Sequence, residues 1–550
     1  MAQTVGYRIA EALADAGVTT MFGVISIHNM PILDAVAEQG RIRFIPARGE
    51  AGAMNMADAF SRVSGELGVA LTSTGTAAGN AAGAQAEALT AGSRVLHITS
   101  TVDRALMDRD RAAIHDVPKQ PEMLRGISKA LFRIWDEKGV QGTISAAIRA
   151  ALTPPTGPVS LEVPIDVQRA QAVAGEKLRV PVPALPQHDT AALDALAARI
   201  LAARRPMLWL GGGARGAAQE ATELVKRGFG AVSSTQGRGV VPESHSASLG
   251  AFNMTPEAEE IYASCDLMIV VGSRLRGNET RNNKMALPSP LFQIDAEPTQ
   301  WGRNYPVDGF ICGDAALTLR ALLDRLPESL ETDPQFHYDI AVARAKSEGA
   351  LRTRLGPYQV VADHLLSTVS SGPHPWVRDV TISNSTFGNR YVQVAAPNLG
   401  VHALGGGIGQ GIAMAVGAAV AAPGVRTYTL LGDGGAQLGL AELITAVDQE
   451  LPITFVLMND AAYGVIENIQ DAQYGGRRHY SKLKTPDFGL LCSAIDMPHT
   501  RVERIEDFVA AVDGAADRSG PVMVEVDMIS IGPFAEAFAG PPAGAAGSQV

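Results

Sequence analysis

Two short runs in the last third of the chain place carboxylates beside glycine or asparagine, directly after apolar stretches. Gly432-Asp433-Gly434-Gly435 follows the apolar residues 427–431, and Asn459-Asp460 follows the apolar residues 453–458. If both stretches are parallel strands, their ends lie where open α/β sheets bind ligands. A Mg²⁺ ion is held by one or two carboxylates plus phosphate oxygens, and glycine lets a backbone approach a phosphate. The pattern therefore predicts a magnesium–diphosphate site, although a Gly-Asp-Gly turn alone is common on protein surfaces.

The spacing of these runs resembles the cofactor signature of the thiamine-diphosphate enzymes, in the group of acetolactate synthase, benzoylformate decarboxylase and benzaldehyde lyase. In that signature, Gly-Asp-Gly is followed about two dozen residues later by asparagine, as Gly434 is followed by Asn459 here. The resemblance implies that Asp433, Asp460 and the carbonyl of Ala462 bind Mg²⁺, with Asp460 standing where asparagine is usual. It also implies a cofactor-binding set of Gly432, Asp433, Gly434, Gly435, Tyr463 and Gly464.

Glu50 is the candidate catalytic carboxylate of the first third of the chain. It follows Arg48-Gly49 and an apolar run, residues 43–46, and opens a helical alanine-rich stretch. The resemblance implies that Glu50 contacts the aminopyrimidine of the cofactor, which lets the cofactor lose its reactive proton. Gly49 stands where many members have histidine. The alternative is an ordinary exposed glutamate at a helix start.

Two further segments resemble parts of the same cofactor site. Residues 403–416 resemble the loop that bends thiamine into a V shape, which makes Ile408 the apolar wedge under the cofactor; the alternative is a core isoleucine. Ser385 and Thr386 lie where the family contacts the diphosphate, although Ser/Thr/Asn clusters are common in loops.

The candidate substrate residues come from four segments. The loop after the first apolar run carries Ser26 and His28, and benzaldehyde lyase has a histidine near the latter position, so His28 is expected to shuttle a proton. His115, a further catalytic candidate, and Gln120 lie in a second segment, and Ser73 lies in a third. Val465 and Ile466 follow the metal loop and are expected to line the pocket. For both histidines the alternative is a hydrogen-bonded polar loop residue.

These residues must be positioned by elements that alternate between apolar runs and helical, alanine-rich stretches. Such alternation predicts an α/β fold with parallel sheets covered by helices. We expect three domains: residues 1–180, the pyrimidine-binding domain; residues 191–330, the middle domain; and residues 356–535, the diphosphate-binding domain. Residues 540–550 are expected to form a flexible tail.

Composition excludes several other classes of protein. The net charge of −11, without a basic stripe, argues against a nucleic-acid partner. Cys265, Cys312 and Cys492 are far apart, which argues against a zinc site or disulfides and favours a reducing, cytoplasmic location. No apolar run of about 18 residues exists, so no membrane span is expected.

The resemblance implies thiamine diphosphate and Mg²⁺ as cofactors, and a homodimer as the minimal active unit, commonly assembled into a homotetramer. We expect a lyase or transferase that decarboxylates a small 2-oxo acid and then joins the product to a second carbonyl. The alternatives are a simple decarboxylase of the benzoylformate type, a hydroxy-ketone lyase, and a non-catalytic cofactor-binding subunit. FAD could bind Gly211-Gly212-Gly213 and Gly272-Ser273-Arg274, but strand-end turns explain these two segments equally well.

Overall fold

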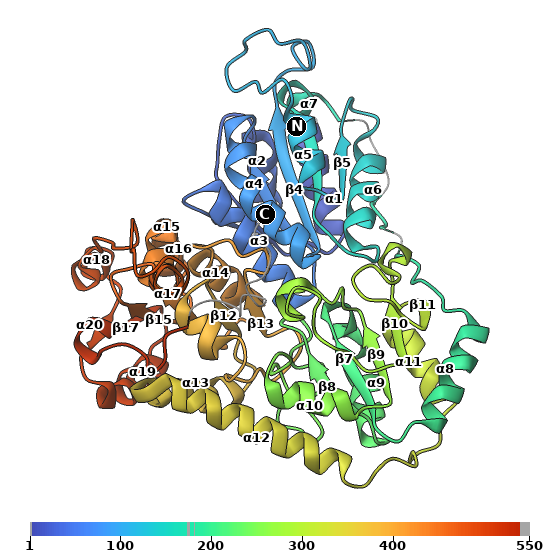
Figure 1. Cartoon of the computed structure of the whole chain (residues 1–550). Helices are drawn as coiled ribbons and strands as arrows, with labels where there is room; N and C mark the ends of the chain where they lie inside the picture. The colour runs from blue at the N-terminus through green and yellow to red at the C-terminus, as the bar shows by residue number, and fades with distance from the viewer. Residues whose placement is uncertain (1–2, 173–176, 181, 539–550) are drawn as a thin grey trace.

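The computed structural model describes residues 3–172, 177–180 and 182–538. The chain forms three α/β units, each built on one sheet (Figure 1). Every strand pair within these sheets is parallel. The predicted fold class is therefore confirmed. The predicted tail, residues 540–550, lies outside the described residues.

The N-terminal and C-terminal sheets have the same strand order. The N-terminal order is β2-β1-β3-β4-β6-β5, and the C-terminal order is β13-β12-β14-β15-β17-β16. The first sheet consists of β1 (Thr20–Gly23), β2 (Arg43–Pro46), β3 (Gly68–Thr72), β4 (Val95–Thr101), β5 (Ala130–Arg133) and β6 (Val159–Pro164). The second consists of β12 (Trp376–Arg378), β13 (Gly400–His402), β14 (Thr427–Gly432), β15 (Ile453–Asn459), β16 (His499–Val502) and β17 (Val522–Asp527).

Between them in the chain lies a five-stranded sheet of order β11-β10-β9-β7-β8. Its strands are β7 (Pro206–Leu210), β8 (Gly230–Ser233), β9 (Leu267–Val271), β10 (Leu291–Asp295) and β11 (Gly309–Cys312). The long helix α12 (Phe336–Leu355) then runs along the bottom edge of the molecule and leads into the C-terminal domain (Figure 1).

Helices cover the sheets of all three domains. In the N-terminal domain they are α1 (Val5–Asp15), α2 (Met30–Gln39), α3 (Glu50–Ser64), α4 (Thr76–Ala91), α5 (Gln120–Gly126), α6 (Val140–Leu152) and α7 (Ile165–Arg169). The middle domain has α8 (Thr190–Ala202), α9 (Ala218–Lys226), α10 (Pro256–Ser264) and α11 (Ala315–Leu323). The C-terminal domain has α13 (Gln359–Ser370), α14 (Gly411–Ala421), α15 (Asp433–Gly439), α16 (Ala441–Asp448), α17 (Gly464–Gln473), α18 (Phe488–Ala494), α19 (Phe508–Ala516) and α20 (Met528–Ile531).

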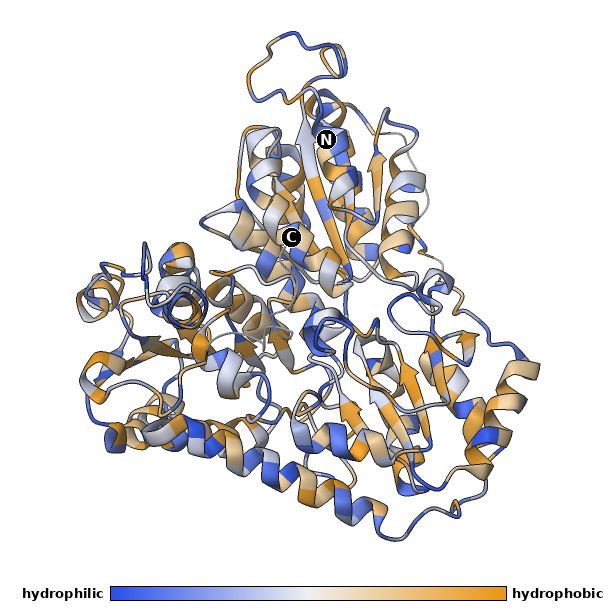
Figure 2. Cartoon of the chain, in the orientation of Figure 1, coloured by the Kyte–Doolittle hydropathy of each residue, from blue (hydrophilic) through white to orange (hydrophobic). Residues whose placement is uncertain are grey.

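The central strands are buried along their whole length and mainly apolar, because helices cover both faces of each sheet. Every residue of β14 and β15 is buried, and the sheets stand out as apolar bands inside the three domains (Figure 2). These mainly apolar runs in the sequence made the strands predictable. No helix among the described residues is long and apolar enough to cross a bilayer.

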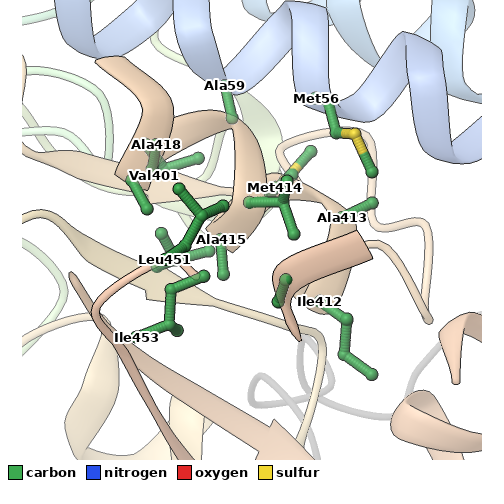
Figure 3. Packing of buried hydrophobic residues seen from close by; sticks show 14 of the residues in the cluster. Met56, Ala59, Val401, Ile412, Ala413, Met414, Ala415, Ala418, Leu451 and Ile453 are labelled. Atoms are coloured by element: carbon green, nitrogen blue, oxygen red, sulfur yellow. The ribbon is translucent and has the colours of Figure 1, made fainter. Parts of the chain in front are cut away.

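The N- and C-terminal domains share one buried apolar cluster, in which α3 packs against α14. Met56 and Ala59 of α3 face Ala413 and Met414 of α14 (Figure 3). A side chain at Gly417 would overlap the carbonyl of Met56, so glycine permits the close approach. This contact fixes the loops that precede the two helices relative to one another.

The helical segment after β14 starts directly at the strand end and is interrupted once. The backbone of Gly432 is extended, and α15 begins at the very next residue, Asp433. Residue Leu440 then separates α15 from α16. The glycines after Asp433 read as turn residues in the sequence, but in the structure they form the first turn of a helix.

Candidate functional site

Two carboxylates meet at the end of the C-terminal sheet, as the sequence predicts. Asp433 follows β14 and Asp460 follows β15, and these two strands are paired up to Gly432 and Met458. The backbone N–H of Asp460 donates to Oδ1 of Asp433 across 3.4 Å. Parallel neighbours therefore deliver both side chains to one point.

Within the described part of the chain, no ion pair balances the negative charges of Asp433 and Asp460. Asp433 is 1% exposed, and its Oδ2 has no hydrogen-bond partner in the described part of the chain. Burial and the negative charge of Asp460 raise the pKa of Asp433 to about 7. Burial also raises the pKa of Asp460. A divalent cation between the carboxylates would relieve both effects, so the donor set fits a metal ion.

The loop after Asp460 contains Ala462, whose carbonyl is the third predicted metal ligand. Ala461 has a positive φ of 51°, and the N–H of Ala462 donates to Oδ1 of Asp460 across 3.2 Å. Across residues 3–172, 177–180 and 182–538 there is no cluster of three His, Cys, Asp or Glu side chains that could hold a metal. Asp433 and Asp460 therefore need backbone, cofactor or water oxygens to complete a coordination shell.

The predicted glycines and Tyr463 line the site formed by Asp433 and Asp460, the carboxylate cradle. A Cβ at Gly434 would lie 2.6 Å from the ring of Tyr463, and one at Gly464 would overlap the carboxylate of Asp460. A Cβ at Gly435 would lie 2.8 Å from Oδ2 of Asp379. These glycines are thus required by protein packing, in addition to any approach of a phosphate.

Asp379, which the sequence analysis missed, holds the loop that carries Ile408. It follows β12, is fully buried, and accepts hydrogen bonds from the N–H groups of Gly409 (3.0 Å) and Gly411 (3.2 Å). Burial raises the pKa of Asp379 to about 6. Ile408 is 39% exposed, so the alternative of a core isoleucine is wrong for the single chain. A Cβ at Gly435 would lie 3.4 Å from Cγ1 of Ile408, which places this side chain beside the carboxylate cradle.

The polar run after β12 offers a different hydroxyl from those predicted. Thr386 uses its hydroxyl to donate to the carbonyls of Ile382 and Ser383, at 3.0 Å each. Ser385 lies in the same π-helical turn (Asn384–Gly388). Ser383 is fully buried, and within the described residues its Oγ has no partner. A buried hydroxyl without a partner is the better candidate for a bound diphosphate; its signal in the sequence was its place as the first polar residue of the run.

Glu50 is the first residue of α3 and is half-buried. Its Oε2 accepts a hydrogen bond of 3.2 Å from Nδ2 of Asn80, in α4. Asn80 itself is exposed. Asn80 was not predicted, because nothing in the alanine-rich run around it marks one polar residue above another.

His28 and His115 lie together, although the sequence placed them in separate segments. Their ring centroids are 5.2 Å apart and the rings are edge to face. Burial, His115 and Arg169 lower the pKa of His28. The hydroxyl of Ser100 donates to the carbonyl of His28 across 2.6 Å, which joins the loop to β4. His115 has a positive φ of 66°, and its carbonyl packs against Gly75.

The remaining predicted pocket residues differ in what they can offer. Gln120 is buried, and its amide is already occupied: Oε1 accepts from the N–H of Gly75 (2.7 Å) and Nε2 donates to Glu162 (2.8 Å). Ser26 accepts a hydrogen bond from the N–H of His28, and the carbonyl of Ser73 accepts one from Thr99. Val465 packs on the C-terminal core, whereas Ile466 is 46% exposed beyond the metal loop.

The glycine runs of the middle domain pack on each other. A Cβ at Gly211 would overlap the carbonyl of Gly272, and one at Gly213 would lie 2.8 Å from Cα of Gly272. These runs therefore act as strand-end turns after β7 and β9, and they give no support to a nucleotide site.

Models of three protein domains match the chain in the order of its three sheets. They describe the thiamine pyrophosphate enzymes: the N-terminal TPP binding domain over residues 3–123, the central domain over residues 193–322 and the C-terminal TPP binding domain over residues 382–526. The chain belongs to the thiamine pyrophosphate enzyme family. The predicted family is confirmed, and the Asp433–Asp460 cradle lies in the C-terminal TPP binding domain.

Named relatives of this thiamine pyrophosphate enzyme span nearly its whole length. A probable 2-ketoarginine decarboxylase of Pseudomonas aeruginosa is 27% identical over 531 residues, 95% of this chain and 94% of its own. An acetolactate synthase of Mycobacterium bovis is 26% identical, covering 94% of this chain and 87% of its own. The X-ray structure of a protein from Mycobacterium smegmatis, described as a thiamin diphosphate-dependent enzyme, superimposes with a TM-score of 0.80 at 23% identity over 96% of this chain and 99% of that one. The last similarity supports the fold alone.

Proposed function

We propose that the chain is a Mg²⁺- and thiamine-diphosphate-dependent enzyme that removes carbon dioxide from a 2-oxo acid and joins the remaining fragment to a second carbonyl. The observation that carries the proposal is the pair of Asp433, which is buried, and Asp460, which is half-buried; the two carboxylates lie at adjoining strand ends and have no cationic partner among the described residues. The names of the relatives, 2-ketoarginine decarboxylase and acetolactate synthase, support a 2-oxo acid as substrate.

The residues of the C-terminal domain would hold the cofactor. Asp433, Asp460 and the Ala462 carbonyl would bind Mg²⁺, and Ser383 would donate to the diphosphate. Ile408 would support the thiamine from below, since its loop is fixed by Asp379. When bound, thiamine diphosphate supplies the electron sink that decarboxylation next to a carbonyl requires.

Glu50 would hold a proton at the aminopyrimidine, oriented by Asn80. This chemistry needs a dry site, yet Asn80 is exposed and Glu50 and Ile408 are partly exposed on the single chain. A second copy of the chain could cover them. We therefore propose a homodimer as the minimal active unit, with a homotetramer as the larger assembly.

A second candidate, simple decarboxylation, is favoured by the His28–His115 pair. Because its pKa is lowered, His28 is neutral at pH 7 and can accept or pass on a proton. Two adjacent histidines could protonate the product carbon before a second carbonyl reacts, and an aldehyde would then be released. The variant His28→Ala should shift the product ratio from aldehyde towards the joined product if this candidate is right.

Carbon dioxide release from pyruvate, benzoylformate and 2-ketoarginine, with and without thiamine diphosphate and Mg²⁺, tests the proposal. Release that requires both cofactors, with a hydroxy ketone or acetohydroxy acid as product, supports carboligation. Release with aldehyde alone supports the second candidate. Equal release by Asp433→Ala and the wild type would contradict the proposed site, because this variant removes the best-placed metal ligand.

A further inference from the structure

Two buried glutamates reach across the boundary between the N- and C-terminal domains. Glu442, in α16, accepts hydrogen bonds from the N–H of Arg48 (3.1 and 3.2 Å to its two oxygens) and the N–H of Gly49 (3.1 Å). Gly49 is directly followed by Glu50. A side chain of the C-terminal domain therefore holds the backbone that presents the proposed catalytic glutamate of the N-terminal domain.

Glu87, in α4, makes the reciprocal contact. It accepts hydrogen bonds from the N–H groups of Leu404 and Gly405, at 2.6 Å each. Both belong to the loop between β13 and α14, which carries Ile408. Arg62 reinforces the contact, because its guanidinium lies 3.3 Å from Glu87 and donates to the carbonyl of His402 across 2.7 Å.

The two contacts occupy corresponding places in the two sheets of equal strand order. Glu87 lies on the helix after β3, and Glu442 lies on the helical segment after β14, the matching strand. Their targets are the loop after β2 and the loop after β13, which also match. The contact is therefore made twice, once in each direction, between helices α4 and α16 and the loops before α14 and α3.

The surroundings of both glutamates are shaped for these hydrogen bonds. Glu442 and Glu87 are 4% and 3% exposed, and a buried carboxylate is strongly unfavourable unless it is hydrogen-bonded. Burial raises the pKa of Glu442, against the hydrogen bonds from Thr445, Arg48 and Gly49. Glycine at two positions leaves space for the two carboxylates. A Cβ at Gly52 would overlap Oε1 of Glu442, and one at Gly405 would lie 2.7 Å from Oε2 of Glu87.

We propose that Glu442 and Glu87 are positioning residues, each holding from the opposite domain the loop that presents a cofactor-contacting residue: Glu442 for Glu50, and Glu87 for Ile408. The inference rests on the proposed function, which assigns these roles to Glu50 and Ile408. The packing of the N-terminal domain against the C-terminal domain then aligns both cofactor loops at the same time.

The test for Glu442 is the rate at which bound thiamine diphosphate exchanges its C2 proton for deuterium, in holoenzyme with Mg²⁺. Glu442→Ala should slow exchange about tenfold or more, because a displaced catalytic group loses its alignment. Gly52→Ala should also slow exchange although it leaves Glu442 in the sequence, since the added methyl group pushes the flexible Glu442 carboxylate aside while alanine favours the helix. Affinity for thiamine diphosphate should stay within about twofold in both variants.

Asp448→Asn is the matched control for Glu442. Asp448 lies on the same helix and pairs with the side chain of the same residue, Arg48, but it is exposed and makes no bond to the loop backbone. It should leave exchange unchanged, and Glu442→Gln, which keeps one acceptor oxygen, should slow exchange less than Glu442→Ala. Wild-type exchange in both Glu442→Ala and Gly52→Ala would overturn the inference, as would equal slowing by Asp448→Asn.

The reciprocal test uses Glu87→Gln and Gly405→Ala. Both should weaken binding of thiamine diphosphate about tenfold with melting temperatures near the wild type, because the loop under the cofactor is released. Unchanged affinity in both would overturn the role of Glu87. Glu50→Gln distinguishes failure of the proposed function from failure of the positioning role. If Glu50→Gln exchanges at the wild-type rate, the proposed function fails. Slow exchange in Glu50→Gln beside wild-type exchange in both Glu442→Ala and Gly52→Ala removes the positioning role alone.

Discussion

The N- and C-terminal domains share a strand order but differ in the charges at their strand ends. In the C-terminal sheet, β12, β14 and β15 are followed by Asp379, Asp433 and Asp460. The matching strands of the N-terminal sheet, β1, β3 and β4, are followed by Val24, Ser73 and Val102. Three acidic residues at strand ends thus separate the edge that we propose binds a cation from an edge without such residues on the same scaffold.

The N-terminal sheet places its functional groups differently. Its carboxylate, Glu50, lies at the start of the helix after β2 rather than directly at a strand end. Its other candidate groups, His28 and His115, come from the loops after β1 and β4. The fold therefore sets where loops meet, and a few side chains decide whether the meeting point binds a metal or contacts the reacting parts of cofactor and substrate.

The largest effect is expected at Asp433. Asp433→Ala should weaken Mg²⁺-dependent binding of thiamine diphosphate on the order of a hundredfold or more, because a first ligand matters at least as much as the outer groups that support it. The matching variant in the other sheet, Ser73→Ala, should leave this affinity unchanged. Calorimetric titration of both variants at fixed Mg²⁺ checks the pair; equal affinities for the cofactor would mean that the charged edge is not its site.

The next largest effect is expected at Glu50. Glu50→Gln should lower kcat about a hundredfold while the cofactor affinity changes little, because general acid–base groups act in turnover rather than in binding. Asn80→Ala, which removes the hydrogen bond of 3.2 Å to Glu50, should have a smaller effect in the same direction. Steady-state kinetics at saturating cofactor measure both. A loss of cofactor affinity that matches the loss of kcat would contradict the assigned role.

Strands and cradle were predictable from the sequence because their signal is local. The mainly apolar runs of β9, β14 and β15 each end at a glycine or a polar residue, and this marks the strand ends that carry Asp433 and Asp460. In contrast, β12 and β13 have three residues each and contain Arg378 and His402. They show no apolar run, so Asp379, at the end of β12, was missed.

The contacts between domains could not be predicted, for a different reason. Nothing in the sequences of α16 and α4 marks Glu442 or Glu87 as buried, and their partners are backbone N–H groups more than 300 positions away in the chain. A backbone donor leaves no residue-type signal. The proximity of His28 and His115 was likewise invisible, since it depends on how the loops after β1 and β4 fold over Gly75.

The two sheets should also respond to pH in opposite directions. Asp379 has a folded-state pKa of about 6, above its ordinary value of 3.8, so its ionisation favours unfolding: stability is greatest below pH 4 and is lost as pH rises to 6. His97, buried in β4 between Thr72 and Gln85, has a pKa lowered to about 3 by burial, so stability is full above pH 6.5 and is lost as pH falls.

The variants Asp379→Asn and His97→Asn isolate these terms. The free energy of unfolding of Asp379→Asn relative to wild type should rise by on the order of 3 kcal/mol between pH 4 and pH 6, and stay flat above. That of His97→Asn should rise relative to wild type as pH falls below 6.5. Denaturant titrations of cofactor-free protein from pH 4 to 8 measure both. Parallel pH profiles for the two variants would contradict the opposite charge preferences of the two buried sites.

The smallest effect is expected between two hydroxyls of the C-terminal domain, those of Ser383 and Thr386. Ser383→Ala removes a buried hydroxyl that has no partner among the described residues, so this hydroxyl can donate a hydrogen bond to a ligand without first breaking another one. Cofactor affinity should fall about tenfold, the effect of one hydrogen bond to a charged group. Thr386→Ala removes a hydroxyl that already donates to Ile382 and Ser383, and it should leave affinity unchanged. If Thr386→Ala weakened binding more than Ser383→Ala, the position expected from the sequence would be right, and the hydrogen bonds of Thr386 would have to break when the diphosphate binds.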